Sequence, residues 1–521
     1  MRQARCALIS VHNKKGVADF ARGLSSLGVR IISTGGTAEH LRRAGIPVIE
    51  VAEFTGQAEA LGGRVKTLHP KIHAGILASR ESEAHRLEME RLGWDYIDLV
   101  AVNLAMPQGE RVTDLNEFMD AMDIGGHALL RAAAKNFRNV IVICNPARYT
   151  LVLDELTSGA GIIPEGLRAR LAREALEAVA CCDAVYHRTL HGFVAPAADL
   201  MPVELKLNLN KIGELRYGEN PHQRAAVYRA MECGEPSVAE SVLLNGKALS
   251  FNNCIDLDAA FEIVKEFRRP ACAIVKHANP CGVAVAEAPV EAYRRARATD
   301  RESAYGGIAG FNAAVDEDVA AELSASFVEC VIAPAFTDAA LETLKGKKNL
   351  RILEVPSFSA WLTGGGVREG GCEMRSITGG MLLQERDLGT IGLGDLTQVT
   401  DAKPSAAEAA AVFFAWTVVK HVRSNAIVIA SEEETVGIGA GQMSRVDAAR
   451  LAVYKAKKPI GGCVAASDGF FTFRDAIDEL ARAGVKTIVQ PGGSKMDGEI
   501  IAACNELGVA MVFTGMRCFK H

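Results

Sequence analysis

The stretch Lys276-His277-Ala278-Asn279-Pro280-Cys281-Gly282 holds the side chains best suited to acid–base chemistry. It follows the apolar run 271–275, which predicts a buried strand that opens into a loop at Pro280 and Gly282. The Lys276 ammonium disfavours a second positive charge beside it, so we expect it to keep His277 neutral. A neutral imidazole can accept a proton from an attacking amine, while the ammonium can stabilise an oxygen that becomes negative. The alternative is a lysine that caps a strand beside a packed histidine.

Three groups in the amino-terminal part suit an anion. Ser33-Thr34-Gly35-Gly36-Thr37 lies where a predicted strand meets a helix, so amides, hydroxyls and a helix N-terminus converge; the alternative is a tight turn with an N-cap. Arg64 and Lys66 would share one face of a strand, which suits a phosphate or an oxyanion; the alternative is a solvated basic edge. Asp123-Ile124-Gly125-Gly126 opens a predicted helix on which Arg131 and Lys135 share a face. Together they predict an anion-binding cleft at one sheet edge.

Four groups in the carboxyl-terminal part suit a nucleotide with a flat ring. Arg216 suits a phosphate, and Tyr217 can stack on a heterocycle. Gly306-Gly307 forms a bend that lets the backbone approach a flat ligand. The stretch 437–445 offers glycine amides and the Arg445 guanidinium. The cluster Phe470-Phe471-Thr472-Phe473 is typical of core more often than of a cofactor platform.

Length and composition exclude several classes of protein. The chain has 521 residues, 49% hydrophobic and 23% charged, as expected of a globular enzyme with several domains. A net charge of −5 and a pI near 6.2 argue against nucleic acid or an anionic membrane as partner. Thirteen scattered cysteines predict a reducing cytoplasm, and no apolar run is long enough for a membrane span. A zinc deaminase is excluded because its His-x-Glu and Pro-Cys-x-x-Cys ligands are missing.

Alternating strands and helices must position the amino-terminal groups. Apolar runs predict strands at 6–11, 29–33, 47–51, 99–104 and 140–144, and three-to-four spacing predicts helices at 14–27, 37–44 and 165–186. This alternation predicts a doubly wound, mostly parallel α/β sheet. A domain boundary is expected near residue 200, in a loop with Pro196 and Pro202.

A faint repeat marks the carboxyl-terminal part. Val275-Lys276-His277 is echoed 144 residues later by Val419-Lys420-His421, and an asparagine follows each, Asn279 or Asn425. This spacing suggests two related α/β subdomains. The second copy ends a helix-like run, 406–422, so we interpret Lys420 and His421 as a helix cap.

The chain resembles the bifunctional purine biosynthesis family that joins a formyltransferase to an inosine monophosphate (IMP) cyclohydrolase. The resemblance covers nearly the whole length, on motifs in one order: SVHNKKG, STGGT, RVKTLHP, DIGG with RAAAKN, LRYGENPHQ, VKHANPCG, GIGAGQMSR, QPGGS and the tip near Arg517. It implies a methylglyoxal-synthase-like cyclohydrolase domain at 1–200 and a duplicated, cytidine-deaminase-like formyltransferase domain at 201–521, with subdomains at about 205–370 and 371–521. It also implies a homodimer and no catalytic metal, and it leaves a bound monovalent cation open.

By this resemblance, the second domain transfers a formyl group from 10-formyltetrahydrofolate to the 5-amino group of aminoimidazole carboxamide ribonucleotide (AICAR). His277 would take the amine proton, and Lys276 would stabilise the formyl oxygen. Arg445 and Arg517 would be best placed for phosphate, and Phe470 and Phe473 would line the folate pocket. The other substrate-binding positions would be Arg216, Tyr217, Gly306 and Asn425.

The first domain would then close formyl-AICAR to IMP with loss of water. Lys66, Asp123 and Lys135 would transfer protons and stabilise charge. The nucleotide would be held by Ser10, Lys14, Ser33, Thr34, Gly35, Gly36, Thr37, Arg64, Thr67, Asn103, Ile124 and Gly125.

One departure from the family pattern bears on cyclisation. Ala105-Met106-Pro107 stands where the family usually has Tyr-Pro-Phe, whose hydroxyl is thought to assist ring closure. Cyclisation is then slower, or another residue or a water fills the gap. Smaller departures are Asn13, His127, Tyr305 and Thr472. One alternative is a formyltransferase whose amino-terminal domain only binds nucleotide, and another is a scaffold without catalysis, which the intact Lys276, His277 and Arg445 disfavour.

Overall fold

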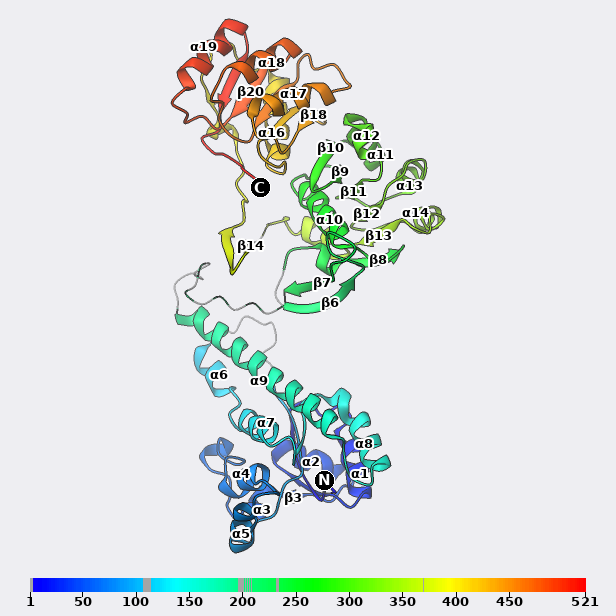
Figure 1. Ribbon diagram of the computed structural model, residues 1–521, viewed down its shortest axis with the longest axis vertical. Coiled ribbons are helices and arrows are strands. Elements are labelled where there is room, and N and C mark those ends of the chain that lie inside the picture. The colour runs from blue at the N-terminus through cyan, green and yellow to red at the C-terminus, as the bar shows by residue number, and fades with distance from the viewer. Residues whose placement is uncertain are drawn as a thin grey trace. The chain divides into compact units, whose positions relative to one another are not determined.

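The computed structural model describes residues 3–105, 114–194, 209–230, 234–368 and 370–521, with positions 201, 203, 205 and 207. Its contacts divide the chain into two compact units, unit 1 (Met1–Asp199) and unit 2 (Leu200–His521). Figure 1 labels their elements along the chain. Four residues named above, Met106, Pro107, Pro196 and Pro202, lie outside the described residues.

Unit 1 is built on a five-stranded parallel sheet in the order β3-β2-β1-β4-β5. The strands are β1 (Cys6–Val11), β2 (Arg30–Ser33), β3 (Ile49–Glu50), β4 (Leu99–Asn103) and β5 (Ile141–Ile143). Runs such as Ala7-Leu8-Ile9 are fully buried, as expected for parallel strands covered on both faces. The predicted doubly wound sheet is therefore confirmed. Strand β3 is shorter than predicted because Val51 already begins a helix.

Amphipathic helices cover this sheet. In α1, Val17, Phe20, Ala21 and Leu24 recur at three-to-four spacing and are buried. Helix α9 extends beyond the predicted end at Tyr186 and packs on α7 and β5 (Figure 1). The helices are α1 (Val17–Ser26), α2 (Gly35–Arg43), α3 (Val51–Thr55), η1 (Leu61–Gly63), α4 (Pro70–Leu77), α5 (Glu83–Leu92), α6 (Leu115–Asp120), α7 (Gly125–Lys135), η2 (Pro146–Arg148), α8 (Tyr149–Ser158) and α9 (Glu165–Val194).

The strand order of unit 1 reverses at β1, which is flanked by β2 and β4. Open α/β sheets bind ligands outside the carboxyl ends of the strands at such a switch point. Helix α1 begins at Val17 and not at the predicted Lys14, so Lys14 lies in the loop that follows β1. The carboxyl ends of β1, β2 and β4 thus bring Lys14, Thr34 and Asn103 to one edge.

Unit 2 contains two six-stranded mixed sheets with the same connectivity. The first has the order β10-β9-β11-β12-β13-β8 and the second β18-β17-β19-β20-β21-β16. Each has an antiparallel hairpin, a further antiparallel pair, two parallel pairs and an antiparallel edge strand. The strands are β8 (Val242–Asn245), β9 (Ala271–Lys276), β10 (Asn279–Val285), β11 (Ile308–Phe311), β12 (Cys330–Ala333), β13 (Arg351–Glu354), β16 (Thr397–Gln398), β17 (Ile427–Ala430), β18 (Thr435–Gly439), β19 (Val464–Ser467), β20 (Thr487–Gln490) and β21 (Ala510–Phe513).

One helix precedes the hairpin in each half of unit 2, α10 in the first and α16 in the second, and both contribute to a single apolar core. Phe267 and Phe414, one from each half, have ring centroids 5.5 Å apart. The helices of unit 2 are α10 (Phe251–Val264), α11 (Pro289–Thr299), α12 (Arg301–Ala304), α13 (Glu317–Ser324), α14 (Asp338–Lys345), α15 (Ser357–Thr363), α16 (Ala406–Val419), α17 (Arg445–Lys455), α18 (Asp475–Ala483) and α19 (Asp497–Leu507), with η3 (Val238–Glu240) and η4 (Leu393–Asp395).

The equivalent strands show that the tripeptide echo in the sequence is not the footprint of the duplication. Lys276 and His277 lie at the β9–β10 turn, whereas Lys420 and His421 follow α16. The second-half equivalent of the β9–β10 turn lies between β17 and β18, at residues 431–434. The matched residues were coincidental, because duplicated folds keep their topology while individual side chains change.

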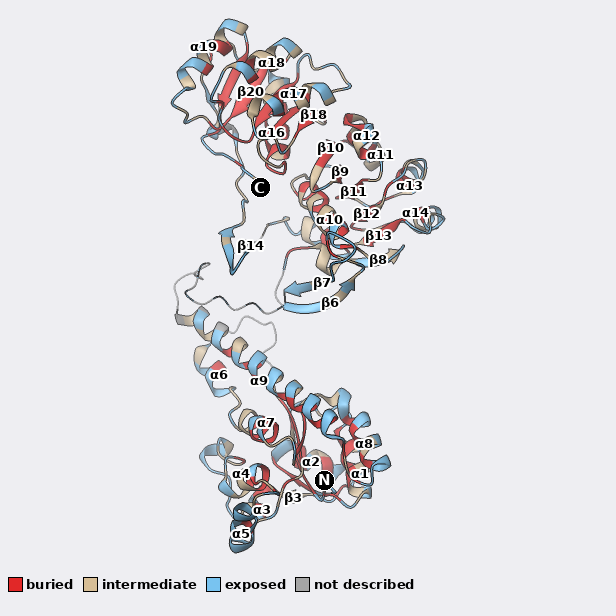
Figure 2. Ribbon diagram, viewed as in Figure 1, coloured by how far each residue is buried: buried red, intermediate tan, exposed pale blue. Residues whose placement is uncertain are grey.

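Two further hairpins, β6 (Leu209–Leu215) with β7 (Ala225–Ala230) and β14 (Cys372–Ile377) with β15 (Gly380–Glu385), stand outside these sheets. Most of their residues are exposed, whereas the central strands of the large sheets are buried (Figure 2). Among the described residues, no helix has the length and apolarity needed to cross a membrane.

Candidate active sites

The predicted loop after β9 is a two-residue hairpin turn. Lys276 pairs with Asn279, which leaves His277 and Ala278 at the tip with φ of 54° and 57°. A turn with two positive φ values normally selects Asn-Gly, and other L-residues cost roughly 1–2 kcal/mol each. The Asp256 carboxylate of α10 offsets this cost by accepting the N–H groups of Ala278 at 2.6 Å and His277 at 3.2 Å. A strained turn held in this way is typical of a functional site.

Lys276 and His277 differ in how far they reach into solvent. His277 is exposed, whereas Lys276 is half-buried and its Nζ donates to the Tyr305 carbonyl at 2.9 Å. Gly306 follows with a φ of 74°, and the Tyr305 and Phe327 rings lie 5.1 Å apart. The structure therefore brings Gly306 beside the Lys276 side chain and leaves the imidazole free to meet a substrate.

Burial raises the pKa of Asp256, and its hydrogen bonds to the N–H groups of Ala278 and His277 act in the opposite direction. These two donors favour the carboxylate form. Sequence analysis missed this residue, although an acidic side chain in the middle of an apolar helix was a signal.

A chain of hydrogen bonds joins this turn to the second half of unit 2. Asn279 Oδ1 accepts the Arg423 N–H at 3.0 Å. Two residues on, Asn425 Oδ1 accepts the Arg445 guanidinium at 2.8 Å. Arg445 also donates to Ser467 Oγ at 2.8 Å and to Asp468 Oδ1 at 2.5 Å. The predicted pair Asn425 and Arg445 is thus brought together beside the hairpin.

Asp468 decides what Arg445 can do. It is fully buried, and it also accepts the Ala426 N–H at 3.1 Å. A buried charge of this kind requires a paired partner. Arg445 is therefore bound first to a protein carboxylate, and a role as phosphate ligand stays a prediction.

The carboxyl-terminal tail reaches the same place. The Lys520 carbonyl accepts the Ser424 N–H at 2.9 Å, and the Asp468 carbonyl accepts the Cys518 N–H at 3.1 Å. Arg517, which directly precedes the Cys518 anchor, has its guanidinium 4.8 Å from the Phe519 ring centroid. Residues far apart in sequence, Asn425, Arg445 and Arg517, are thus gathered at one edge.

The aromatic cluster at 470–473 divides into two kinds of residue. Phe471 is 1% exposed and belongs to the core, as its cluster was predicted to. Phe470 and Phe473 are 38% and 68% exposed, so the core interpretation is wrong for them. Two exposed phenyl rings beside Gly469, whose Cβ position meets Arg445 and Phe519, leave apolar surface for a flat ligand.

The Arg216 loop is held on α10. The Tyr217 carbonyl accepts the Phe251 N–H at 3.2 Å, and the Glu219 carbonyl accepts from Asn252 at 3.2 Å. The guanidinium of the exposed Arg216 lies 5.4 Å from the Tyr217 ring centroid. Because Asp256 lies on the same helix about 8 Å further along at 1.5 Å per residue, α10 positions both the loop and the hairpin turn.

Sequence analysis missed a buried ion network in unit 2. Lys265 Nζ contacts Glu235 at 2.9 Å and Glu262 at 2.7 Å. Glu266 contacts Lys420 at 2.9 Å and His421 at 3.0 Å. Arg368 and Arg386 complete the network. Lys420 is the C-cap residue of α16, so the structural interpretation of Lys420 and His421 is confirmed.

This buried ion network predicts that the free energy of unfolding decreases in acid. Burial lowers the pKa of His421 to about 4, against its hydrogen bond with Glu266. In the unfolded chain this histidine has its ordinary pKa of about 6.5. Between about pH 6.5 and about pH 4 the unfolded chain therefore binds one proton more than the folded protein. The free energy of unfolding falls over this range by about 3 kcal/mol as the pH drops. Urea unfolding followed by tryptophan fluorescence should show this slope, and His421→Gln should flatten it while His222→Gln should not. Equal slopes in all three proteins would contradict this origin.

In unit 1, two lysines converge on the N-terminus of α2. A methyl group placed on Gly35 would lie 3.7 Å from Lys66 Nζ, and one placed on Gly36 would lie 3.9 Å from Lys14 Nζ. The free amides and positive dipole end of a helix favour an anion, and two ammonium groups reinforce this. The predicted anion cradle thus receives Lys14, Lys66, Gly35 and Gly36.

The N-terminus of α7 carries the second part of this site. A methyl group on Gly125 would lie 2.6 Å from Thr67 Oγ1, so only glycine allows this approach. Asp123 Oδ1 accepts the Gly126 N–H at 3.0 Å, and Ile124 is the exposed N-cap residue. Thr67 follows Lys66, so the two helix N-termini are linked by the same segment.

Several predicted ligands hold the scaffold instead of facing outward. Ser33 Oγ donates to the Ile9 carbonyl at 2.6 Å, and Thr37 Oγ1 donates to the Val11 carbonyl at 3.0 Å. Asn103 Oδ1 accepts the N–H groups of His12 and Asn13. The expectation that all hydroxyls of 33–37 serve as ligand donors is therefore wrong, because Ser33 and Thr37 fix the loop to β1. Thr34, the N-cap residue of α2, and the half-buried Ser10 lie at the same edge.

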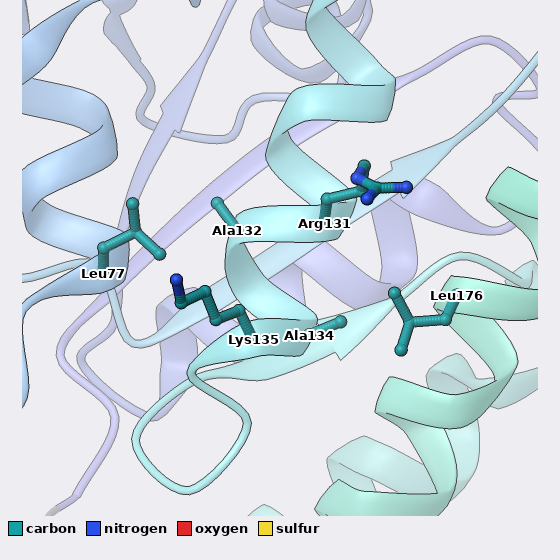
Figure 3. A pocket seen from close by; sticks show the side chains of 6 residues that line it. All are labelled: Leu77, Arg131, Ala132, Ala134, Lys135 and Leu176. Carbon is teal, nitrogen blue, oxygen red and sulfur yellow. The ribbon is translucent and has the colours of Figure 1, made fainter.

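The structure corrects one prediction on the cations of unit 1, the strand over residues 64–67. Residues 64–67 do not form a strand, since η1 ends at Gly63 and a turn follows, so Arg64 and Lys66 do not share a strand face. The exposed Arg64 pairs with Asp120 at 2.6 Å. Lys135 ends α7, about 15 Å along the axis from Gly125. With Arg131 it lines a separate hollow of about 360 Å³ next to Leu77 and Leu176 (Figure 3).

These folds and sites define a protein of two α/β units, one with two lysines at a helix N-terminus and one with a lysine–histidine turn beside an arginine, which is the side-chain chemistry of an enzyme. Among the described residues, no group of three or more His, Cys, Asp or Glu side chains could hold a metal ion.

Comparison with known proteins identifies the family. A model of the AICARFT/IMPCHase bienzyme matches residues 133–455, and one of the MGS-like domain matches residues 16–128. The bifunctional purine biosynthesis protein PurH of Magnetococcus marinus is 48% identical over 540 residues, covering 100% of both chains. That of Persephonella marina is 46% identical over 525 residues, covering 99% of this chain and 100% of its own. The chain belongs to this family of bifunctional formyltransferase and cyclohydrolase enzymes of purine biosynthesis.

The crystal structure of ForH aligns with 36% of this chain and 98% of its own at 37% identity, with a TM-score of 0.34.

Proposed function

We propose that unit 2 transfers the formyl group of 10-formyltetrahydrofolate to the 5-amino group of AICAR, and that unit 1 closes the product to IMP. The observation that carries this division is the strained turn that holds Lys276 and His277 beside Arg423, Asn425 and Arg445. Unit 1 offers two helix N-termini with Lys14 and Lys66 but has no equivalent lysine–histidine turn among its described residues.

Formyl transfer requires proton movement at two nitrogens. The amine nitrogen attacks the formyl carbon, the new N–C bond forms, and the bond from that carbon to folate N10 breaks. The exposed His277 takes the amine proton, and that proton leaves with N10. Lys276 stabilises the formyl oxygen while it is negative, and its contact with the Tyr305 carbonyl fixes the side chain for that task. Phe470 and Phe473 supply apolar surface for the folate ring.

Cyclisation joins two groups of one molecule, so positioning supplies much of the rate. The carboxamide nitrogen attacks the formyl carbon and forms the new N–C bond. The formyl oxygen departs as water with one proton from the carboxamide nitrogen and one from the formamide nitrogen, which leaves a C=N double bond in the new ring. Lys66 stabilises that oxygen, and Asp123 moves the proton at the start of α7. Lys135 lies at the other end of α7, so its role stays a prediction that rests on the resemblance alone.

We further propose that the protein acts as a cytoplasmic homodimer. Hairpin β14–β15 exposes Met374, Ile377, Met381 and Leu382, each between 42% and 55%. An isolated two-stranded sheet is marginally stable in water, and apolar side chains exposed on both of its faces favour a partner surface. A second copy of the chain is the expected partner. A bound monovalent cation remains an expectation of the resemblance.

Two assays on one preparation test the division of labour. The protein should consume AICAR and 10-formyltetrahydrofolate with a rise in the tetrahydrofolate signal, and should convert supplied formyl-AICAR to IMP. Formyl transfer without IMP above the uncatalysed rate would favour the formyltransferase-only alternative that Ala105 motivates. A flat tetrahydrofolate signal would overturn the assignment of unit 2.

A further inference from the structure

Helix α9 places a tyrosine under the turn that carries Asp123. The Tyr186 side chain is 6% exposed, and its hydroxyl accepts the Asp123 backbone N–H at 3.4 Å. The ring packs on Phe118 with centroids 5.5 Å apart and on His127 with centroids 6.1 Å apart. A buried phenol requires polar partners, and here they are the backbone of the predicted catalytic residue and the Cys182 thiol.

Two hydrogen bonds define the placement of Asp123. Its carboxylate caps the Gly126 N–H at 3.0 Å, and its own N–H is bound by Tyr186. Residues 121–124 form no helix or strand, so secondary structure does not hold the turn. Without the phenol, the Asp123 peptide loses one of its two anchors, and the carboxylate that it carries can move.

The same face of α9 also contacts the segment after β4, where Ala105 stands in place of the tyrosine that the family usually has. Cys182 lies four residues before Tyr186, which puts both on one face of the helix. Its Sγ lies 4.0 Å from the Ala105 carbonyl oxygen. Leu104 packs against the cluster of Phe118, Cys182 and Tyr186. Position 105 therefore borders the packed cluster that contains the Tyr186 ring.

We propose that Tyr186 is a positioning residue for cyclisation, which holds Asp123 in its reactive orientation. This inference rests on the proposed function of unit 1. The phenol acts through Asp123 and does not need to touch the substrate. In a site where a displacement of about 1 Å can cost about 100-fold in rate, one anchor of a reacting group has a measurable effect.

Tyr186→Phe tests the role, because it removes the hydroxyl and keeps the ring on Phe118. Tyr149→Phe is the matched control, since Tyr149 is also 6% exposed in unit 1 and packs on Phe20 at 4.5 Å. We expect Tyr186→Phe to lower kcat for formyl-AICAR cyclisation about 10-fold with KM unchanged, and the control to cyclise normally. Formyl transfer should be the same in both. A wild-type kcat for Tyr186→Phe, or an equal loss in the control, would overturn the proposal.

Two further measurements separate positioning from general stability. In an Asp123→Asn background, Tyr186→Phe should have almost no additional effect on kcat, because the two residues act as one unit. A full additional loss would contradict the role.

Hydrogen exchange at the Asp123 amide should accelerate in Tyr186→Phe and not in Tyr149→Phe. Unchanged exchange in Tyr186→Phe would show that the phenol does not anchor the Asp123 peptide. Since exchange needs no substrate, it tests the anchor even if the wild-type protein makes no IMP, an outcome that would refute the proposed function of unit 1 instead.

Discussion

Replacing His277 by alanine is expected to lower kcat for formyl transfer by about 10²–10⁴-fold and to leave cyclisation of formyl-AICAR unchanged. The imidazole is the exposed group at the tip of the β9–β10 turn, next to the Lys276 ammonium. Without a base, the attacking amine keeps its proton and the tetrahedral intermediate reverts. Release of tetrahydrofolate in the presence of AICAR measures the loss, and conversion of supplied formyl-AICAR to IMP on the same preparation measures the second activity.

Turn geometry must be distinguished from proton transfer, because His277 has a φ of 54°. His277→Asn is the suitable second variant, since asparagine tolerates this conformation and has no basic nitrogen. Both variants should lose transfer to a similar extent. Recovery of transfer in His277→Asn would mean that the turn, and not the base, is what the reaction requires.

The second large effect is expected in unit 1. Lys66→Ala should reduce the rate of formyl-AICAR cyclisation by about 10²–10³-fold and leave formyl transfer intact. Lys66 Nζ lies beside Gly35 at the N-terminus of α2, and Thr67 beside it meets Gly125 at the N-terminus of α7. Loss of the ammonium removes the charge that stabilises the departing oxygen at this point.

Lys71→Ala is the matched control for Lys66→Ala, because it removes the same charge from the same segment. Lys71 lies over the Phe54 ring at 4.8 Å and has no place in the cradle. Steady-state kinetics on formyl-AICAR should show a normal rate for Lys71→Ala. If both variants lose activity equally, the effect comes from the overall charge of the segment and not from the position of Lys66.

Much of the fold was predictable because its signals are local. Apolar runs such as Ala7-Leu8-Ile9 predict buried parallel strands wherever they are placed, and the spacing of Val17, Phe20 and Leu24 predicts one helix face. The paired glycines 35–36 and 125–126 likewise marked the two helix N-termini. The ends of the elements were less predictable. Helix α1 begins three residues after Lys14, and strand β9 is followed by a two-residue turn and the antiparallel strand β10 where a loop was predicted.

The sequence indicated which residues belong to the candidate sites, but not how these residues are arranged in space. Sequence pattern could not show that Asp256 holds the His277 turn, that Asp468 engages Arg445, or that Lys135 ends α7 far from Asp123. Each of these depends on where a second element lies, and a one-dimensional pattern does not contain that distance. The buried ion network is the clearest case, since Glu266 and His421 lie 155 residues apart.

The amino-acid sequence by itself determined the secondary elements, the parallel sheet of unit 1 and the residue types able to bind a nucleotide and move protons, because these follow from periodicity and side-chain chemistry. Only the tertiary structure decided which of those residues are free to act. Ser33, Thr37 and Asn103 bind the backbone, Lys14 and Lys66 meet at one helix end, and Tyr186 reaches Asp123 from a helix 63 residues away. The reason is that hydrogen-bond partners are assigned by packing, which brings distant segments within about 3 Å of one another.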